Sequence, residues 1–218
     1  MAEMRTEEEQ VQAIKDWWKN NGSSLLIGIA AALAIVFGWQ AWQNQQMQHR
    51  TEAASQFASL INAYTDESRE DRAETVKFVA SALREDYSDS AYAIYGSLIL
   101  ARQQLMDQDD VEAAISTLEW ANGKVDQTTP LSLIIRSRLA RAQFDAEDYD
   151  AALSTLEGAT DAGRFAEIFS ELRGDVLLAQ GNNEEARKAY LNAREQNGAA
   201  RSGILELKLA DLGVGEGT

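Results

Sequence analysis

An uncharged apolar segment near the start of the chain constrains its fold more than any other feature. The eighteen residues Leu25–Trp42, LLIGIAAALAIVFGWQAW, contain no charged side chain. As a helix they would be about 27 Å long, close to the roughly 30 Å hydrocarbon core of a bilayer. Trp17 and Trp18 precede the segment and Trp39 and Trp42 end it, as expected of aromatic side chains at the two headgroup layers. The sequence therefore predicts a transmembrane helix over residues 23–42.

A cleaved signal peptide is the alternative explanation for this segment. Residues 1–24 carry five acidic and three basic residues, whereas a signal peptide begins with a positively charged region. No A-x-A cleavage site follows the apolar run, so we expect an uncleaved anchor. Three basic residues precede the segment and only Arg50 follows it closely, which predicts a cytoplasmic N-terminus and a C-terminal domain in the periplasm or outside the cell.

The segments that flank the span are also patterned. Residues 1–22 form a predicted cytoplasmic amphipathic tail, in which Val11, Ile14 and Trp17 or Trp18 recur at helical spacing. We expect this helix to end at Asn20-Asn21-Gly22, because glycine readily adopts the left-handed conformation that closes a helix. Residues 43–50 predict a polar juxtamembrane segment. The tail either seats the anchor in the interface or docks on a partner.

Small residues line one face of the predicted span. Ala30, Ala34 and Gly38 are four residues apart, so they share a helix face on which another membrane helix can approach closely. We predict a lateral helix contact there. Passive anchoring is the alternative.

Three copies of one helical pattern follow the anchor. The copies are DVEAAISTLEWA at 110–121, DYDAALSTLEGA at 148–159 and NNEEARKAYLNA at 182–193. Ala152 and Ala186 are 34 residues apart, the period of tetratricopeptide repeats, and Ala114 precedes Ala152 by 38. Such a repeat is a hairpin of two helices, so the small residue is expected at the helix crossing.

The residues between these alanines predict the rest of each hairpin. The larger residues Leu118, Leu156 and Tyr190 are expected in the core, and Ala121, Ala159 and Ala193 against the next repeat. In the first helices Gly174 takes the small position of the third copy. The turns are expected at Asp109-Asp110, Glu147-Asp148 and Gly181-Asn182.

These patterns predict an all-α protein, with a single N-terminal transmembrane helix followed by a tetratricopeptide-like helical-hairpin solenoid over residues 51–212. The expected parts are a divergent hairpin over 51–89, repeats over 90–123, 130–160 and 164–196, a capping helix over 199–212 and a flexible tail over 213–218. Terminal repeats of a solenoid are usually atypical, which accounts for the divergent hairpin and the cap.

The chain lacks the residue sets that enzymes use. His49 is the only histidine and there is no cysteine, so no Ser-His-Asp set, Cys-His pair or zinc cluster can form. The acidic stretches at 107–110 and 145–150 lack the glycine and spacing of a calcium loop, and no phosphate-binding loop occurs. We therefore predict a protein that is not an enzyme and has no catalytic, cofactor-binding or metal-binding residues. From Arg50 onward the net charge is −13, which argues against nucleic acid as a partner.

A solenoid of hairpins offers a concave wall made from the first helix of each hairpin, suited to a partner helix or an extended peptide. The repeat register predicts twelve groove residues: Tyr95, Leu98, Arg102, Leu105, Ile134, Ser137, Arg141, Phe144, Ile168, Glu171, Asp175 and Leu178. Several of the aliphatic ones are equally expected in the core.

The order of these parts resembles a known family. EEEQVQAIKDWWKNNG, a single span ending FGWQAWQ and a divergent tetratricopeptide-like domain look like the YfgM family of ancillary SecYEG translocon subunits. The resemblance covers nearly the whole chain, and its most specific part is Glu7 to Trp42. It implies a cell inner membrane protein with a periplasmic domain, whose partners are SecYEG, the membrane-anchored chaperone PpiD and emerging secreted chains. The family has no established catalytic residues.

The resulting hypothesis is a non-enzymatic, membrane-anchored adaptor that links secreted proteins at the translocon to periplasmic chaperones. The alternative is a membrane-tethered periplasmic scaffold for cell-envelope assembly, unrelated to the translocon. Both use the same repeats, so the sequence leaves both open.

Overall fold

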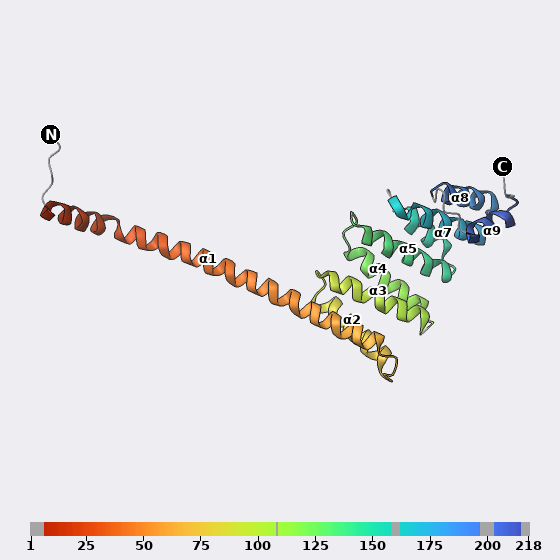
Figure 1. Cartoon of the computed structure of the whole chain (residues 1–218), viewed down its shortest axis with the longest axis horizontal. Helices are drawn as coiled ribbons and strands as arrows, with labels where there is room; N and C mark the ends of the chain where they lie inside the picture. The colour runs from red at the N-terminus through yellow and green to blue at the C-terminus, as the bar shows by residue number, and fades with distance from the viewer. Residues whose placement is uncertain (1–6, 108, 158–161, 197–202, 215–218) are drawn as a thin grey trace. The chain divides into compact units, whose positions relative to one another are not determined.

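The computed structural model describes residues 7–107, 109–157, 162–196 and 203–214, and within these ranges it contains helices and turns but no strand (Figure 1). The all-α class predicted from the sequence is therefore confirmed. The chain divides into two compact units, Met1–Glu52 and Ala53–Thr218. The helices are α1 (Glu7–Thr65), α2 (Arg72–Asp86), α3 (Ala91–Met106), α4 (Val111–Lys124), α5 (Pro130–Asp145), α6 (Tyr149–Glu157), α7 (Ala166–Ala179), α8 (Asn183–Gln196) and α9 (Gly203–Asp211), with a short 3₁₀ turn at Gly163–Phe165.

In the first unit, α1 contains the apolar segment, and its side chains are exposed almost throughout. Among the described helices it is the one that is long and apolar enough to cross a membrane. A soluble core helix would bury such side chains, so their exposure fits a helix surrounded by lipid.

The helix end expected at Asn20-Asn21-Gly22 is wrong, because α1 continues through it. The Asn21 side chain donates a hydrogen bond to the Trp17 carbonyl at 3.0 Å, one turn back within the helix. Gly22 lies beneath the Trp18 ring, where an added Cβ would approach ring atoms to 3.2 Å. Glycine in a helix costs only about 1 kcal/mol, and this cost does not interrupt the hydrogen-bond ladder here. Residues 43–50 are helical as well.

The second unit is a series of helical hairpins that follow one another in chain order (Figure 1). The pairs α3–α4, α5–α6 and α7–α8 correspond to the predicted repeats over 90–123, 130–160 and 164–196. Four buried clusters form the core, and each one joins neighbouring elements. The first helix of each hairpin contributes to two clusters, so α3, α5 and α7 hold the unit together in the nearest-neighbour manner of a solenoid.

The repeat residues occupy the predicted environments. Ala114, Ala152 and Ala186 are fully buried, as expected of small residues at helix crossings. The larger residues Leu118, Leu156 and Tyr190 are 1%, 6% and 0% exposed. Ala121 and Ala193 are also buried, whereas Ala159 lies outside the described residues. Helix crossings here are close because the side chains that meet there are single methyl groups.

Gly174 occupies the position in the third hairpin at which a small residue was predicted. A Cβ at this residue would overlap the ring of Tyr190 on the next helix, α8. Only glycine leaves room for that ring, which is fully buried.

Each of the three turns within the hairpins contains one residue with a positive φ angle. These residues are Asp109, Glu147 and Gly181, with φ angles of 52°, 60° and 80°. Asp148 and Asn182 donate their backbone N–H to the carbonyl five positions earlier at 2.9 Å, whereas Asp110 donates to Gln104, six positions earlier, at 2.9 Å. This pattern closes a helix with one left-handed residue. The turns predicted at these three positions are confirmed.

Buried polar pairs add a second link inside two hairpins. The Thr117 hydroxyl donates to the Gln104 side chain at 3.0 Å, and Thr155 donates to Gln143 at 2.7 Å at the equivalent position. A paired polar group avoids the cost of an unsatisfied buried one. In the third hairpin Leu177 takes the glutamine position and is buried in an apolar cluster.

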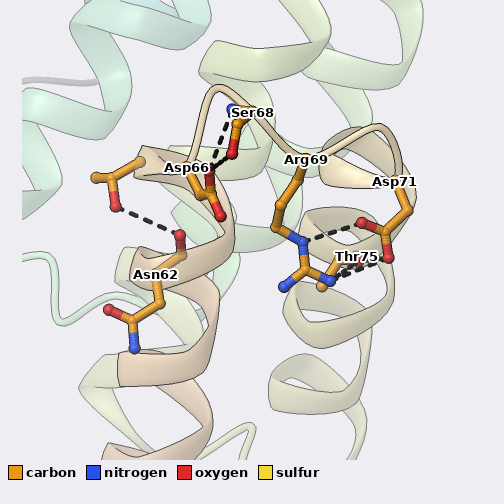
Figure 2. A network of polar contacts seen from close by, with 7 residues as sticks. Asn62, Asp66, Ser68, Arg69, Asp71 and Thr75 are labelled. Atoms are coloured by element: carbon orange, nitrogen blue, oxygen red, sulfur yellow. Dashed lines mark hydrogen bonds and ion pairs between the residues drawn. The ribbon is translucent and has the colours of Figure 1, made fainter.

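The opening hairpin joins α1 to α2 through a polar turn (Figure 2). Asp66 accepts hydrogen bonds from the Ser68 backbone and hydroxyl, at 3.1 and 2.5 Å. Arg69 donates two hydrogen bonds to Asp71, at 2.9 and 3.0 Å, and Thr75 donates a third at 3.1 Å. The hydrogen bonds from Arg69 and Thr75 lower the pKa of Asp71 to about 2. The Asp71 carboxylate of this turn therefore stays charged at all ordinary pH values.

The C-terminal helix α9 packs Leu205 and Leu209 into the cluster of α7 and α8. It is shorter than the predicted capping helix over 199–212, of which residues 199–202 lie outside the described residues. Gly213 and Val214, the first two residues of the predicted flexible tail over 213–218, lie within the described residues. Gly213 has a φ of 78°, and Val214 donates its backbone N–H to Leu209 at 3.0 Å. Together they close α9 and bring Val214 onto the apolar cluster.

Candidate functional site

An apolar cavity of about 370 Å³ lies in the second unit, bounded mainly by the first helices α3, α5 and α7; we call it the α3–α5–α7 cavity. Its lining residues are Leu98, Ala101, Arg102, Leu105, Met106, Leu118, Ser137, Arg138, Arg141, Ile168 and Leu172. The volume is at the lower end of the roughly 300–1,000 Å³ range of ligand pockets. A cavity of this volume can accommodate apolar side chains of a partner.

The floor of the cavity is part of the hydrophobic core. Leu98, Leu118 and Leu172 are 8%, 1% and 1% exposed, and Leu118 reaches the cavity from α4, behind the first helices. Ala101 is short, which leaves space between α3 and α5. Ile168 and Met106 are 46% and 75% exposed, so the apolar surface continues from the floor to the rim. Exposed apolar surface of this kind often marks an interaction site.

The charged residues of the lining are all cationic. Arg102, Arg138 and Arg141 line the cavity, and no described lining residue is acidic. Arg141 pairs with Asp175 at 3.8 Å, whereas neither Arg102 nor Arg138 has an ion pair with a described carboxylate. Nearby, burial raises the pKa of Asp145, and the charge of Arg141 opposes that shift. The site is a local positive region within a strongly acidic domain.

A polar pocket of about 420 Å³ adjoins the cavity and shares Arg102 and Met106 with it. Tyr64 stands between two guanidinium groups there, with Arg72 5.0 Å and Arg102 6.0 Å from its ring centroid. Arg72 also pairs with Asp107 at 3.5 Å. This pocket therefore contains both cationic and anionic hydrogen-bonding side chains, and it lies beside an apolar cavity.

Six of the twelve predicted groove residues line the cavity: Leu98, Arg102, Leu105, Ser137, Arg141 and Ile168. Tyr95 lies instead 6.2 Å, centroid to centroid, from the Phe57 ring, and Phe144 lies 5.9 Å from the Tyr149 ring in its own hairpin. Ile134 is half-buried and Leu178 is exposed, both away from the cavity lining.

Glu171 and Asp175 do not line the cavity and contact the end helix instead, although Asp175 also pairs with Arg141 of the cavity lining at 3.8 Å. Lys208 of α9 lies 2.7 Å from Glu171 and 2.6 Å from Asp175, and Tyr190 donates its hydroxyl to Asp175 at 2.8 Å. Burial, followed by the hydrogen bond to Asp175, raises the pKa of Tyr190 far above its usual value. The end helix thus occupies the part of the predicted groove that these two acids were expected to line.

Sequence reasoning missed five lining residues, namely Ala101, Met106, Leu118, Arg138 and Leu172. Leu118 was predicted only as a core residue of its repeat. Arg138 carried a usable signal, because it lies one residue from Ser137 and one turn from Arg141 on the same helix.

In the first unit, Ala30, Ala34 and Gly38 are exposed on α1, and a Cβ at Gly38 would meet no other atom within 4 Å. They remain a predicted helix contact. Among the described residues there is no group of three or more His, Asp or Glu side chains arranged to hold a metal ion.

The stacked hairpins, the alanine crossings and the left-handed turns define a tetratricopeptide-like helical repeat protein. A family model for the tetratricopeptide repeat-like domain matches residues 15–214, and the chain belongs to this family.

Curated relatives sharpen this assignment. The chain is 28% identical over 212 residues to a protein of Haemophilus influenzae, covering 97% of this chain and 100% of the relative. It is 29% identical over 210 residues to one of Escherichia coli, covering 95% and 97%, and 26% identical over 215 residues to one of Neisseria gonorrhoeae, covering 97% and 100%. All three are named ancillary SecYEG translocon subunit. The resemblance stated from the tail and anchor is thereby confirmed.

Proposed function

We propose that this protein is an ancillary subunit of the SecYEG translocon, a non-enzymatic adaptor held at the inner membrane by α1. The observation that carries the proposal is full-length similarity to relatives of that name, which includes both the anchor and the repeats. Repeat domains of this kind act by binding other proteins, and tethering raises their effective concentration near a membrane pore.

The partners we propose are SecYEG, through the membrane helix, and a PpiD-like membrane-anchored chaperone or an emerging secreted chain, through the repeat domain. The N-terminus would lie in the cytoplasm and the repeats in the periplasm, since basic residues are more frequent before the span than just after it. In this arrangement the adaptor would link secreted proteins to periplasmic chaperones.

Co-purification of the full chain tests the proposal. The protein is crosslinked in native membranes, extracted in mild detergent and analysed by mass spectrometry. SecYEG subunits and a membrane-anchored periplasmic chaperone are the expected products. Their absence from the crosslinked material would contradict the proposal.

The anchor itself separates translocon association from tethering. A triple variant, Ala30→Leu, Ala34→Leu and Gly38→Leu, should insert normally and yet lose SecYEG, because bulky side chains prevent close helix approach. Ala32→Leu with Val36→Leu, on the opposite helix face, is the matched control and should retain SecYEG. If the wild type does not retain SecYEG and replacing the whole span by an unrelated anchor leaves its other partners in place, membrane tethering alone suffices and the envelope-scaffold alternative is favoured instead.

A further inference from the structure

The α3–α5–α7 cavity has a charge opposite to that of the domain around it. Residues 53–218 contain 29 acidic and 16 basic residues. Three of those bases line one apolar cavity without an acidic residue among the described lining. Charges on a protein surface are screened beyond a Debye length of about 8 Å at physiological salt, so a ligand in the cavity experiences mainly the nearest charges, which include the three arginines and Asp175 beside Arg141.

Arg102 and Arg138 carry this charge, because Arg141 is partly neutralised by Asp175 at 3.8 Å. Both side chains are exposed, which leaves their guanidinium donors available to a ligand. A guanidinium group pairs with carboxylates through two parallel hydrogen bonds. The apolar floor and the arginine rim therefore fit an apolar side chain with a carboxylate beside it.

The protein contains the complementary arrangement at its own C-terminal end. The helix α9 buries Leu205 and Leu209 while Lys208 between them reaches Glu171 and Asp175. Asp175 occupies the repeat position of Arg102 and Arg141. Where this repeat position is acidic, it binds a helix that carries apolar side chains and a cation. Where the position is basic, as at Arg102 and Arg141, we therefore expect a ligand that carries apolar side chains and a carboxylate.

The adjoining polar pocket favours a polypeptide over a fatty acid. A peptide that leaves the cavity past Arg102 reaches Tyr64, Arg72 and Asp107. These side chains can donate hydrogen bonds to backbone carbonyls and accept them from backbone N–H groups. A hydrocarbon tail would gain nothing from these groups.

From this geometry we infer that the α3–α5–α7 cavity binds a segment of a partner protein in which apolar side chains are flanked by Asp or Glu. The inference rests on the proposed function and adds the chemistry of the partner. The apolar side chains occupy the floor formed by Leu98 and Leu172, and the carboxylates pair with Arg102 and Arg138.

Peptide binding to the full chain in detergent or nanodiscs tests the inference. The probe is a fluorescent peptide with Glu-Leu-Leu-Glu between Gly-Ser flanks, measured by anisotropy beside the matched peptides Lys-Leu-Leu-Lys and Glu-Ser-Ser-Glu. The first should bind at least about tenfold more tightly than either of the others. Equal binding of the Glu and Lys peptides would overturn the inference, as would saturable binding of oleate without binding of the Glu peptide.

Substitutions locate the binding. Arg102→Glu with Arg138→Glu should weaken binding of the Glu peptide by at least about tenfold and strengthen binding of the Lys peptide, whereas Arg102→Lys with Arg138→Lys keeps the charge but not the paired hydrogen bonds and should weaken binding of the Glu peptide by less. Lys77→Glu, exposed on α2, makes the same change of charge per residue and should have no effect. Thermal unfolding confirms that each variant is folded. Unchanged peptide binding in the double Glu variant would overturn the inference.

A cavity-filling variant gives a second readout that involves no charge. Ser137→Phe would occupy the cavity and should abolish binding of the Glu peptide, so retained binding in a folded variant would also overturn the inference. SecYEG co-purification is measured on the same variants. If the wild-type protein retains SecYEG but binds no peptide, the inference fails and the proposed function stands; if SecYEG is absent from the wild-type material, the proposed function fails.

Discussion

The α3–α5–α7 cavity and the C-terminal end of α7 use one repeat position in opposite ways. In the first two hairpins this position is Arg102 and Arg141, which line an open cavity. In the third hairpin it is Asp175, which accepts a hydrogen bond from Tyr190 and pairs with Lys208 of the end helix. The backbone positions correspond, and the side chains decide whether the site is closed by the chain itself.

This difference shows how a repeat fold separates stability from binding. At the C-terminal end the polar groups are satisfied internally and contribute to stability, whereas at the cavity Arg102 and Arg138 are exposed without a described carboxylate partner. Substitutions at the closed end should therefore change the free energy of unfolding. Substitutions at the arginines should change binding alone.

The largest effect is expected from Lys208→Glu, which breaks the closed end. It would place a third carboxylate beside Glu171 and Asp175, in a site where Asp175 is only 12% exposed. We expect a loss of about 3 kcal/mol in the free energy of unfolding, measured by chemical denaturation of the full chain. Lys77→Glu is the control and should change it by about 0.5 kcal/mol or less. Equal stability of the two variants would show that α9 does not depend on this ion pair.

Gly174→Ala tests the packing beside the same site. Alanine normally stabilises a helix relative to glycine, but here its Cβ would overlap the buried Tyr190 ring. The overlap should outweigh the helix preference of alanine and destabilise the protein by about 2 kcal/mol. At Gly123 on α4 an added Cβ meets nothing within 4 Å, so Gly123→Ala should instead stabilise by about 0.5 kcal/mol. Thermal unfolding distinguishes the two signs.

Tyr190→Phe isolates the hydrogen bond to Asp175. Its loss should cost about 1 kcal/mol at pH 7. The pKa of Tyr190 is raised in the folded protein, so its stabilising effect is complete below the ordinary tyrosine pKa of about 10 and is lost as pH rises above that value. The advantage of the wild type over the variant should therefore be smaller at about pH 10.5 than at pH 7, with the decrease beginning only near pH 10.

Chemical denaturation at the two pH values measures this change. Tyr95→Phe is the control, because its ring is exposed, and it should show no such pH dependence relative to wild type. A gap between Tyr190→Phe and wild type that is constant with pH would contradict the assignment.

The smallest effect is expected at the turns, where the hairpins are equivalent. Glu147 has a left-handed φ of 60°, which costs a non-glycine residue about 1 kcal/mol or slightly more. Glu147→Gly removes this cost but makes the unfolded chain more flexible, so the expected gain is about 0.5 kcal/mol. The reverse change, Gly181→Ala at a φ of 80°, should destabilise by about 1 kcal/mol. Both are measured by thermal unfolding.

The repeat pattern was sufficient to predict the hairpins, because alanine at a crossing and leucine one turn later are local packing requirements. Ala114, Ala152 and Leu118 are buried for that reason. The continuity of α1 was missed, since Asn-Asn-Gly is typical of a helix end and only the absence of a competing structure lets the helix continue. Residues typical of a helix end stop a helix only where the chain that follows can form a more stable alternative structure.

The candidate site was less predictable than the hairpins. The register of α5 placed Ser137 and Arg141 on the concave wall but omitted Arg138, since the angle at which α3, α5 and α7 meet is not encoded in any one helix. Glu171 and Asp175 were expected in the groove because nothing near them in sequence reveals Lys208, 37 positions beyond Glu171. Contacts between distant segments decide which predicted groove residues remain open.

The four apolar clusters also have a consequence for how the second unit folds. Each cluster joins elements that are adjacent in the chain, so no hairpin must wait for a distant segment before it can bury its leucines. Loop-closure entropy is therefore small at every step, and topologies of this kind fold rapidly. A chain delivered gradually from one end could complete its structure hairpin by hairpin, with α9 as the final piece.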